Sequence, residues 1–282
     1  MQVKHVLIIE GCCNLLIMAC KLAVGLTTHS TAIIADAFHS LTDVGNNVVA
    51  WFALNQAQQP ADNDHPYGHQ KYIPLAIFFL ATLLVVLAVE VVVTAIERFG
   101  EPVEQSFIGL AILMGALLAN ALLTAWQSYW AKRLASELLA ADAKHTFSDV
   151  LSSIAIIVGW QLAVSGWPWL DTLFALIMAA IIAYLAYKLF KQSIPILVDS
   201  TTVDHRDVKA KIQRLDGVDA IRQVRTRFDG ERLIGDIIIV SPSSLNANES
   251  HEIADRIERL LAQEFGIADV IVHIEPAPTC RD

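Results

Sequence analysis

Two short stretches of the chain carry the same histidine and aspartate side chains at the same spacing. Residues 35–44 read ADAFHSLTDV and residues 141–150 read ADAKHTFSDV, so six of the ten positions are identical. In each stretch a histidine precedes an aspartate by four positions, which places both on one face of a helix. The two pairs are His39 with Asp43, and His145 with Asp149. Two imidazole nitrogens and two carboxylate oxygens suit a tetrahedral divalent ion, with Zn²⁺ as the leading candidate.

Each stretch also begins with an acidic residue, Asp36 in the first and Asp142 in the second. We interpret both as helix-start residues, which cap the first turn or favour the helix dipole. A single His-x-x-x-Asp near a helix end would be weak evidence for a ligand. The doubled motif favours one shared metal site, because charged groups inside apolar segments persist mainly where they bind something or face a cavity.

Two further sets of residues could bind metal. The loop QQPADNDHPYGHQK at residues 58–71 contains Asp62, Asp64, His65 and His69, and a turn there could bring Asp62, His65 and His69 onto one ion. Near the end of the chain stand Asp236, His251, His273 and Glu275. The plain alternatives are an ordinary polar loop in the first case and scattered, solvated side chains in the second.

Six apolar stretches are long enough to cross a bilayer, whose core of roughly 30 Å needs about 20 helical residues. The stretch 106–130 contains no charged residue, and the stretch 73–96 contains only Glu90. The full set is residues 6–26, 31–54, 73–96, 106–130, 150–164 with the turn before it, and 170–188. We therefore expect a membrane α-helical domain of six transmembrane helices over residues 1–198, with the two His-Asp pairs on the second and fifth.

From residue 199 the chain becomes rich in charged residues. A helix is expected at 203–215, strands at 218–228 and 233–241, an amphipathic helix at 248–265 and a last strand at 268–275. This αββαβ order predicts a separate C-terminal α+β domain over residues 199–282.

Basic residues mark one side of the membrane. Arg98 is alone on one side, whereas the other side has six basic residues: Lys4, Lys71, Lys132, Arg133, Lys188 and Lys191. The positive-inside rule then places both termini and the C-terminal domain in the cytoplasm. We expect a multi-pass protein surrounded by lipid, in a bacterial inner (plasma) membrane. The net charge of −9 argues against a nucleic-acid partner.

The paired His-x-x-x-Asp motifs in the second and fifth spans resemble those of the cation diffusion facilitators, the family of zinc-transporter-type exporters. DHPYGHQK at 64–71, VRTR at 224–227 and DVIVHIEP at 269–276 are also similar to that family, so the resemblance covers nearly the whole chain. It implies a homodimeric antiporter, not an enzyme, that exchanges a cytoplasmic divalent metal for protons. The cytoplasmic domain would have a metallochaperone-like fold that dimerises and binds regulatory metal.

The resemblance assigns roles to residues of this chain. The transport site would be His39, Asp43, His145 and Asp149, and the His-plus-Asp second span resembles the zinc-preferring members; Cd²⁺, Co²⁺, Fe²⁺ and Mn²⁺ stay open as substrates. The loop site would be Asp62, His65 and His69, and the tail site would be Asp236, His251, His273 and Glu275. Arg222 and Ile238 stand where some members have histidines, which argues for one weaker tail ion or a metal shared across the dimer.

An ion pair at the junction of membrane and tail would map to Lys71 and Asp199. Three rival functions are a passive metal channel, a membrane metal sensor and a membrane metalloenzyme. The enzyme would need an open ligand position and a general base, typically in His-Glu-x-x-His. The chain has no such motif, since HEIAD at His251 lacks the second histidine.

Overall fold

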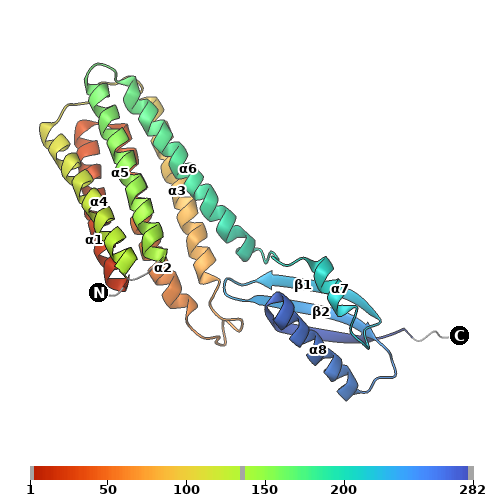
Figure 1. The fold of residues 1–282 in the computed structure, drawn as a ribbon. Coiled ribbons are helices and arrows are strands. Elements are labelled where there is room, and N and C mark those ends of the chain that lie inside the picture. Colours follow the sequence, from red (N-terminus) through yellow and green to blue (C-terminus); the bar gives the residue numbers. More distant parts are fainter. Residues whose placement is uncertain (1–2, 134–136, 279–282) are drawn as a thin grey trace. The chain divides into compact units, whose positions relative to one another are not determined.

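The computed structural model describes residues 3–133 and 137–278 of the chain. Inside three helices it describes the backbone alone for residues 3–8, 10, 43, 46–51, 54, 137–142, 144 and 145. The chain begins with six long helices (Figure 1): α1 (Val3–Thr28), α2 (Thr31–Ala57), α3 (Tyr72–Glu97), α4 (Phe107–Arg133), α5 (Glu137–Val164) and α6 (Trp169–Leu197).

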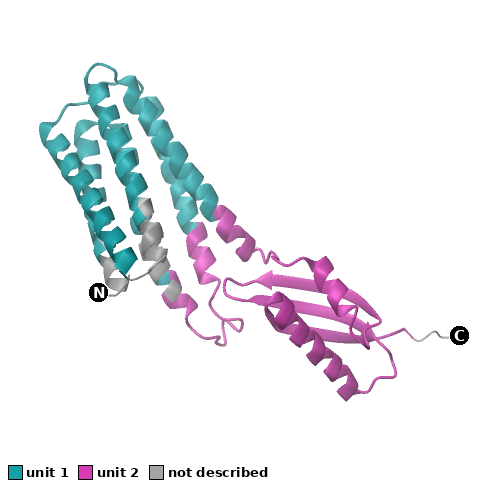
Figure 2. Ribbon diagram, in the orientation of Figure 1, with its two compact units in different colours: residues 1–52, 79–189 teal, residues 53–78, 190–282 magenta. Residues whose placement is uncertain are grey.

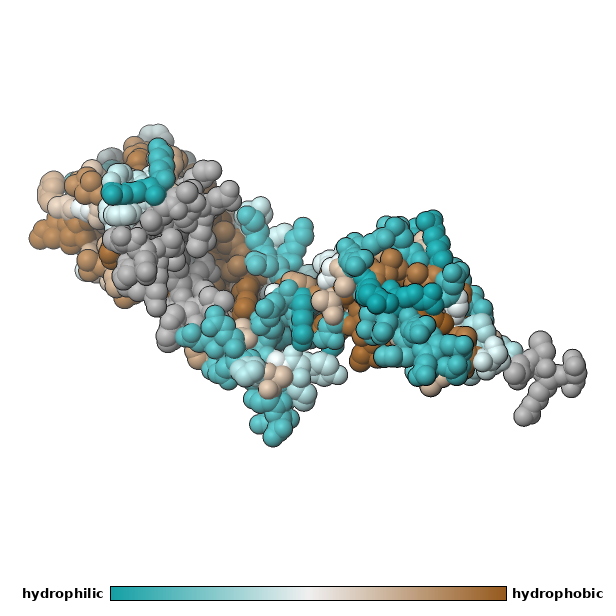
Figure 3. Space-filling view, turned by 60° about the horizontal axis from the view of Figure 1, so that its bottom comes forward, coloured by the Kyte–Doolittle hydropathy of each residue, from teal (hydrophilic) through white to brown (hydrophobic). Residues whose placement is uncertain are grey.

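Most of these helices have the length and the apolar composition needed to cross a membrane. Among the described residues, five helices contain a segment long and apolar enough to span one: Gly11–Thr28, Tyr72–Glu97, Phe107–Arg133, Thr146–Val164 and Trp169–Leu197. The sixth, α2, is the least apolar, because it carries the polar residues of the first motif. Large apolar side chains such as Leu16, Phe79 and Leu122 are exposed on the helix surfaces, as lipid contact requires. Figure 3 shows hydrophobic residues on the surface of the helical part of the chain. The predicted membrane α-helical fold is confirmed, and α5 begins at Glu137, earlier than the expected span.

The turn between α1 and α2 is closely packed. Ser30 N–H donates to the carbonyl of Gly25 at 3.1 Å. A Cβ on Gly25 would lie 2.8 Å from Cγ1 and 2.9 Å from the backbone nitrogen of Ile34, so only glycine lets the two helices approach this closely here.

A residue from the far end of the helical domain completes the start of α2. The carboxylate of Asp171, in the first turn of α6, accepts hydrogen bonds from Thr31 N–H at 2.8 Å, from Ala32 N–H at 3.3 Å and from the Ser30 hydroxyl. Ser30 Oγ in turn accepts from Ile33 N–H at 3.3 Å. These contacts satisfy N–H groups that a helix start leaves unpaired, and they hold α2 against α6.

The C-terminal elements are α7 (His205–Ile212), β1 (Ala220–Phe228), β2 (Leu233–Ser241), α8 (Ala247–Phe265) and β3 (Ile267–Pro276). The sheet order is β1-β2-β3, with β1 antiparallel and β3 parallel to β2. One core joins Val208 and Ile212 of α7, Ile257 of α8, and Ile237 and Ile239 of β2, so both helices cover the same face of the sheet. The predicted αββαβ order is confirmed.

The described chain groups into two compact units (Figure 2). One comprises residues 1–52 and 79–189, and the other residues 53–78 and 190–282. The loop at 58–71 therefore belongs to the same unit as the C-terminal sheet. The domain boundary between residues 198 and 199 stays a prediction.

Replacing the cap on α2 tests how much this contact stabilises the helical domain. Asp171→Ala leaves buried N–H groups without an acceptor, which costs about 1–3 kcal/mol. We expect the midpoint of thermal unfolding in detergent to fall by about 2–10 °C. Glu101→Gln is the control, because Glu101 is exposed and, among the described residues, its ion pair is with Arg98 at 3.0 Å. Equal midpoints for the two variants would show that the cap does not stabilise α2.

Candidate metal centre

The two repeated motifs meet across the helical domain. His39 lies on α2 and Asp149 on α5, and His39 Nε2 is 3.3 Å from Asp149 Oδ1. Their side chains are only 7% and 13% exposed. Two ligand atoms that bind one tetrahedral zinc ion at roughly 2.0–2.1 Å lie roughly 3.3 Å apart. The structure therefore places one residue from each motif at the spacing that a shared ion requires.

The other two residues of the predicted site lie on the same two helices. Asp43 lies on α2 one turn beyond His39, and His145 lies on α5 one turn before Asp149. Their side chains, like that of Asp142, fall outside the described residues. The four-ligand transport site of His39, Asp43, His145 and Asp149 thus stays a prediction that one described contact supports.

The interpretation of Asp36 as a helix-start residue is wrong. α2 begins five residues earlier, at Thr31, and Ser30 and Asp171 provide its cap. Asp36 is buried, and its Oδ2 lies 3.0 Å from Nζ of Lys21 on α1. The sequence contains a signal for this pair, namely a lysine inside the first apolar segment, since such a charge needs a partner in a membrane.

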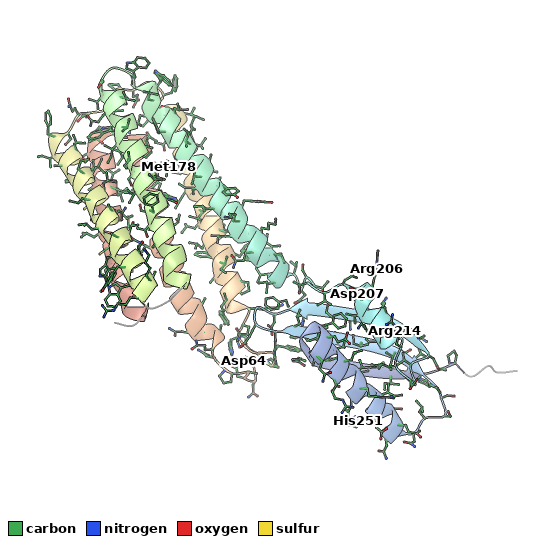
Figure 4. All side chains as sticks on the ribbon, in the orientation of Figure 1. Asp64, Met178, Arg206, Asp207, Arg214 and His251 are labelled. Carbon is green, nitrogen blue, oxygen red and sulfur yellow. The ribbon has the colours of Figure 1, made fainter. Side chains whose placement is uncertain are left out.

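The loop between α2 and α3 brings together the three residues predicted there. The ligand atoms of Asp62, His65 and His69 all lie within 4.8 Å of one another. Asp62 Oδ1 is 3.4 Å from His65 Nδ1, and Asp62 Oδ2 is 3.5 Å from His69 Nε2. Asp64, labelled in Figure 4, is not part of this group. One carboxylate and two imidazoles form a suitable ligand set for a divalent transition metal.

Hydrogen bonds within the loop prepare Asp62 to bind a cation. The backbone N–H of His65 donates to Asp62 Oδ1 at 2.7 Å, and that of Asp64 donates to the same oxygen at 3.0 Å. The bond from His65, followed by smaller effects including the bond from Asp64, lowers the pKa of Asp62. The carboxylate is therefore ionised at neutral pH, as a metal ligand must be.

The tail residues are not brought together within one chain. Among the described residues, the group Asp62, His65 and His69 is the one cluster of three or more that could hold a metal ion. Asp236 pairs with Arg225 at 3.4 Å and Glu275 with Arg222 at 2.6 Å. His251 is on α8 (Figure 4), its side chain is 79% exposed, and its Nε2 lies 3.7 Å from Oδ1 of Asp255. His273 lies on β3 beside Ile238 of β2.

The expected ion pair between Lys71 and Asp199 is confirmed, with Nζ and Oδ1 2.8 Å apart. Asp199 adopts a left-handed backbone conformation, with φ of 57°. Its second carboxylate oxygen lies 3.7 Å from Nη1 of Arg227, the last residue of the VRTR motif. Asp199 therefore joins the loop after α2, the end of α6 and strand β1 within one compact unit.

Neutralising the loop carboxylate tests the loop site. Asp62→Asn should lower the zinc bound to the purified full chain by about one ion per chain, because the site loses its charged ligand. Asp64→Asn is a matched control, since it removes a neighbouring acid outside the group. The bound zinc is measured by elemental analysis after equilibrium dialysis. Equal zinc contents in the two variants would contradict the assignment.

The lowered pKa of Asp62 gives the folded loop a pH dependence of its own. The Asp62 carboxylate stabilises the folded loop at pH values above the ordinary aspartate pKa of about 3.9, and this stabilisation is lost as pH falls through the lower, folded pKa. The thermal unfolding midpoint of wild type should therefore exceed that of Asp62→Asn at about pH 5, and this difference should shrink as pH falls below about 4. A difference that is the same at both pH values would contradict the role of the carboxylate.

Comparison with known proteins agrees with this architecture. The model of the cation efflux transmembrane domain matches residues 7–198, and that of the cation efflux protein cytoplasmic domain matches residues 201–277. The manganese efflux system protein MneS of Bacillus subtilis is 29% identical over 265 residues, covering 93% of this chain and 91% of its own. The cation-efflux pump FieF of Pectobacterium atrosepticum is 29% identical over 253 residues, covering 88% and 84%. The chain thus belongs to the cation efflux family, which is also known as the cation diffusion facilitators and consists of membrane transporters rather than enzymes.

Proposed function

We propose that this chain exports a divalent transition metal, with Zn²⁺ as the preferred ion, from the cytoplasm in exchange for protons. The transport site is His39, Asp43, His145 and Asp149. The observation that carries this proposal is the 3.3 Å contact between His39 on α2 and Asp149 on α5, because it joins the two copies of the repeated motif.

The composition of the site favours zinc. Zn²⁺ accepts a tetrahedral set of two nitrogens and two oxygens, whereas Mg²⁺ and Ca²⁺ prefer six or more oxygens. The name of MneS refers to manganese, so Mn²⁺ is the first competitor to test, together with Fe²⁺, Co²⁺ and Cd²⁺. Geometry and ligand type, more than raw affinity, decide between such ions.

The charge of the site explains why protons are the counter-ion. Two carboxylates inside a membrane need compensation, because an isolated charge there is costly. One divalent ion bound to two aspartates and two neutral histidines leaves the site neutral. When the ion departs, two protons on the same four groups restore neutrality. The contact between His39 Nε2 and Asp149 Oδ1 provides a place for one of those protons.

The transport cycle uses this exchange on the two sides of the membrane. Metal binding from the cytoplasm displaces protons, since the ligands must be deprotonated. Movement of α2 and α5 relative to their neighbours then exposes the site to the other side, where protons return and the ion leaves. The basic loops favour cytoplasmic termini, in a bacterial inner membrane. A dimer formed through the C-terminal domain would hold two such units together.

Transport measurements in proteoliposomes test the assignment. Asp149→Asn should slow zinc flux by about 100-fold or more, because the ion loses one of its two charged ligands. Ser152→Ala is the matched control on α5, since Ser152 is half-buried and its hydroxyl donates to the carbonyl of Ser148 on the same helix at 3.1 Å. The control should stay within about two-fold of wild type. Wild-type flux in Asp149→Asn would show that the site is wrong.

The same vesicles distinguish an antiporter from a channel. A pH-sensitive dye is trapped inside, and each of Zn²⁺, Mn²⁺, Fe²⁺, Co²⁺ and Cd²⁺ is offered in turn. We expect proton movement opposite to that of the metal, fastest with Zn²⁺. Metal flux without proton movement would support a passive channel instead.

A further inference from the structure

A second polar cluster lies inside the helical domain. Lys21 Nζ of α1 lies 3.0 Å from Asp36 Oδ2 and donates to Ser40 Oγ at 3.1 Å, both on α2. Ser153 of α5 donates its hydroxyl to Asp36 Oδ2 at 3.5 Å. All four residues are buried, with exposed fractions of 2% for Lys21, 3% for Asp36, 7% for Ser40 and 3% for Ser153. One buried ammonium therefore contacts a carboxylate and a hydroxyl oxygen, and a second hydroxyl donates to the same carboxylate.

The cluster lies one helical turn from the contact between His39 and Asp149. On α2, Asp36 precedes His39 by three positions; on α5, Ser153 follows Asp149 by four. Since α2 and α5 run in opposite directions at this contact, both displacements point toward the start of α2 and the end of α5. The two clusters are thus consecutive polar layers between the same two helices, with a spacing of about 5 Å.

Stability alone does not account for this cluster. A buried ion pair recovers its desolvation cost only when its remaining hydrogen-bonding groups are also satisfied, and apolar residues of similar size usually serve as well. Within the described part of the chain, Asp36 Oδ1 is buried without a hydrogen-bond partner. Asp36 therefore keeps an open acceptor that the ion pair with Lys21 does not use.

We propose that Asp36, Ser40 and Ser153 form a relay position for the transported cation, and that Lys21 occupies it as a tethered cation until the metal ion displaces its ammonium group. This proposal rests on the proposed function. While the ammonium is in place, it repels a divalent ion and keeps that ion on His39 and Asp149. When Lys21 withdraws, one carboxylate and two hydroxyl groups become available to the ion.

The ligand types at the relay position favour weak and short-lived binding of the ion. A single carboxylate with hydroxyl oxygens binds a transition metal more weakly than a site with two imidazoles and two carboxylates, and a transported ion must be able to leave. In the proposed topology the start of α2 and the end of α5 lie on the extracytoplasmic side. The relay position therefore stands on the exit path of the ion.

Zinc binding to the full-length chain tests the relay position without requiring transport. Lys21→Met removes the tethered cation and leaves Asp36 free, so this variant should bind about one more Zn²⁺ per chain than Lys21→Met/Asp36→Asn. The loop and tail residues are the same in both proteins and cancel in the comparison. Equal zinc contents would overturn the proposal. Should Lys21→Met fail to fold, Lys21→Gln serves in its place, because its amide can still contact Ser40.

Flux through Asp36→Asn gives an independent test. Its maximal rate of zinc export should fall about 10-fold while the half-saturating zinc concentration stays unchanged, because the transport site still loads. A merely structural role would instead lower the amount of folded protein and leave its rate per folded chain unchanged. A wild-type rate, or a rise in half-saturating concentration that matches the fall in rate, would overturn the proposal. Wild-type flux in Asp149→Asn would refute the proposed function alone. The difference in bound zinc between Lys21→Met and Lys21→Met/Asp36→Asn does not depend on Asp149.

Discussion

Polar side chains inside a bilayer must find partners within the protein, and this requirement governs the arrangement of the helices that carry the site. His39 and Asp149 are separated by 110 positions along the chain, yet Nε2 and Oδ1 lie 3.3 Å apart. That contact fixes the rotation of α2 and α5 about their axes, because each helix must present the correct face. The cap from Asp171 on the start of α2 then keeps the helix from sliding along its axis.

Two polar layers of different composition follow one another along α2 and α5. One contains the imidazole and carboxylate of the contact itself, and the other contains an ammonium, a carboxylate and two hydroxyl groups. In the second layer the ammonium of Lys21 and the carboxylate of Asp36 offset each other's charge, as the low dielectric of the membrane demands. A divalent cation can enter such a series only if an equivalent positive charge leaves. The proposed exchange of two protons follows this rule, and the proposed displacement of Lys21 would remove one of the two positive charges.

The sequence contained enough information for some of these features. The repeated ADA-x-H-x-x-x-DV pattern predicted that α2 and α5 would share one site, because four-residue spacing places a histidine and an aspartate on one helix face. Short stretches rich in β-branched residues predicted the strands, and apolar residues at helical spacing predicted α8. Pro66 and Gly68 favour a turn in the loop between α2 and α3. The structure brings Asp62, His65 and His69 together in this loop. In these cases the determining interactions are local, or the motif is duplicated.

Other features depend on contacts between distant residues of unlike type. Nothing near Asp171 in the sequence indicates that its carboxylate caps a helix 140 positions away. Asp36 was interpreted as a helix-start residue because acidic residues are common in the first turn of a helix. The helix begins earlier, and Asp36 forms an ion pair with Lys21. The tail residues occupy different elements, and Arg222 and Arg225 neutralise two of their acids, which spacing alone does not show.

In the proposed transport site, residues from α2 and α5 bind one ion together. A double-mutant cycle on zinc affinity tests it most directly, using His39→Ala, Asp149→Ala and the double variant in a chain that also carries Asp62→Asn to remove the loop site. If both side chains bind the same ion, the second substitution should cost far less affinity than the first, because the site is already lost. Strictly additive losses of affinity would mean that His39 and Asp149 act independently, and would contradict a shared metal site.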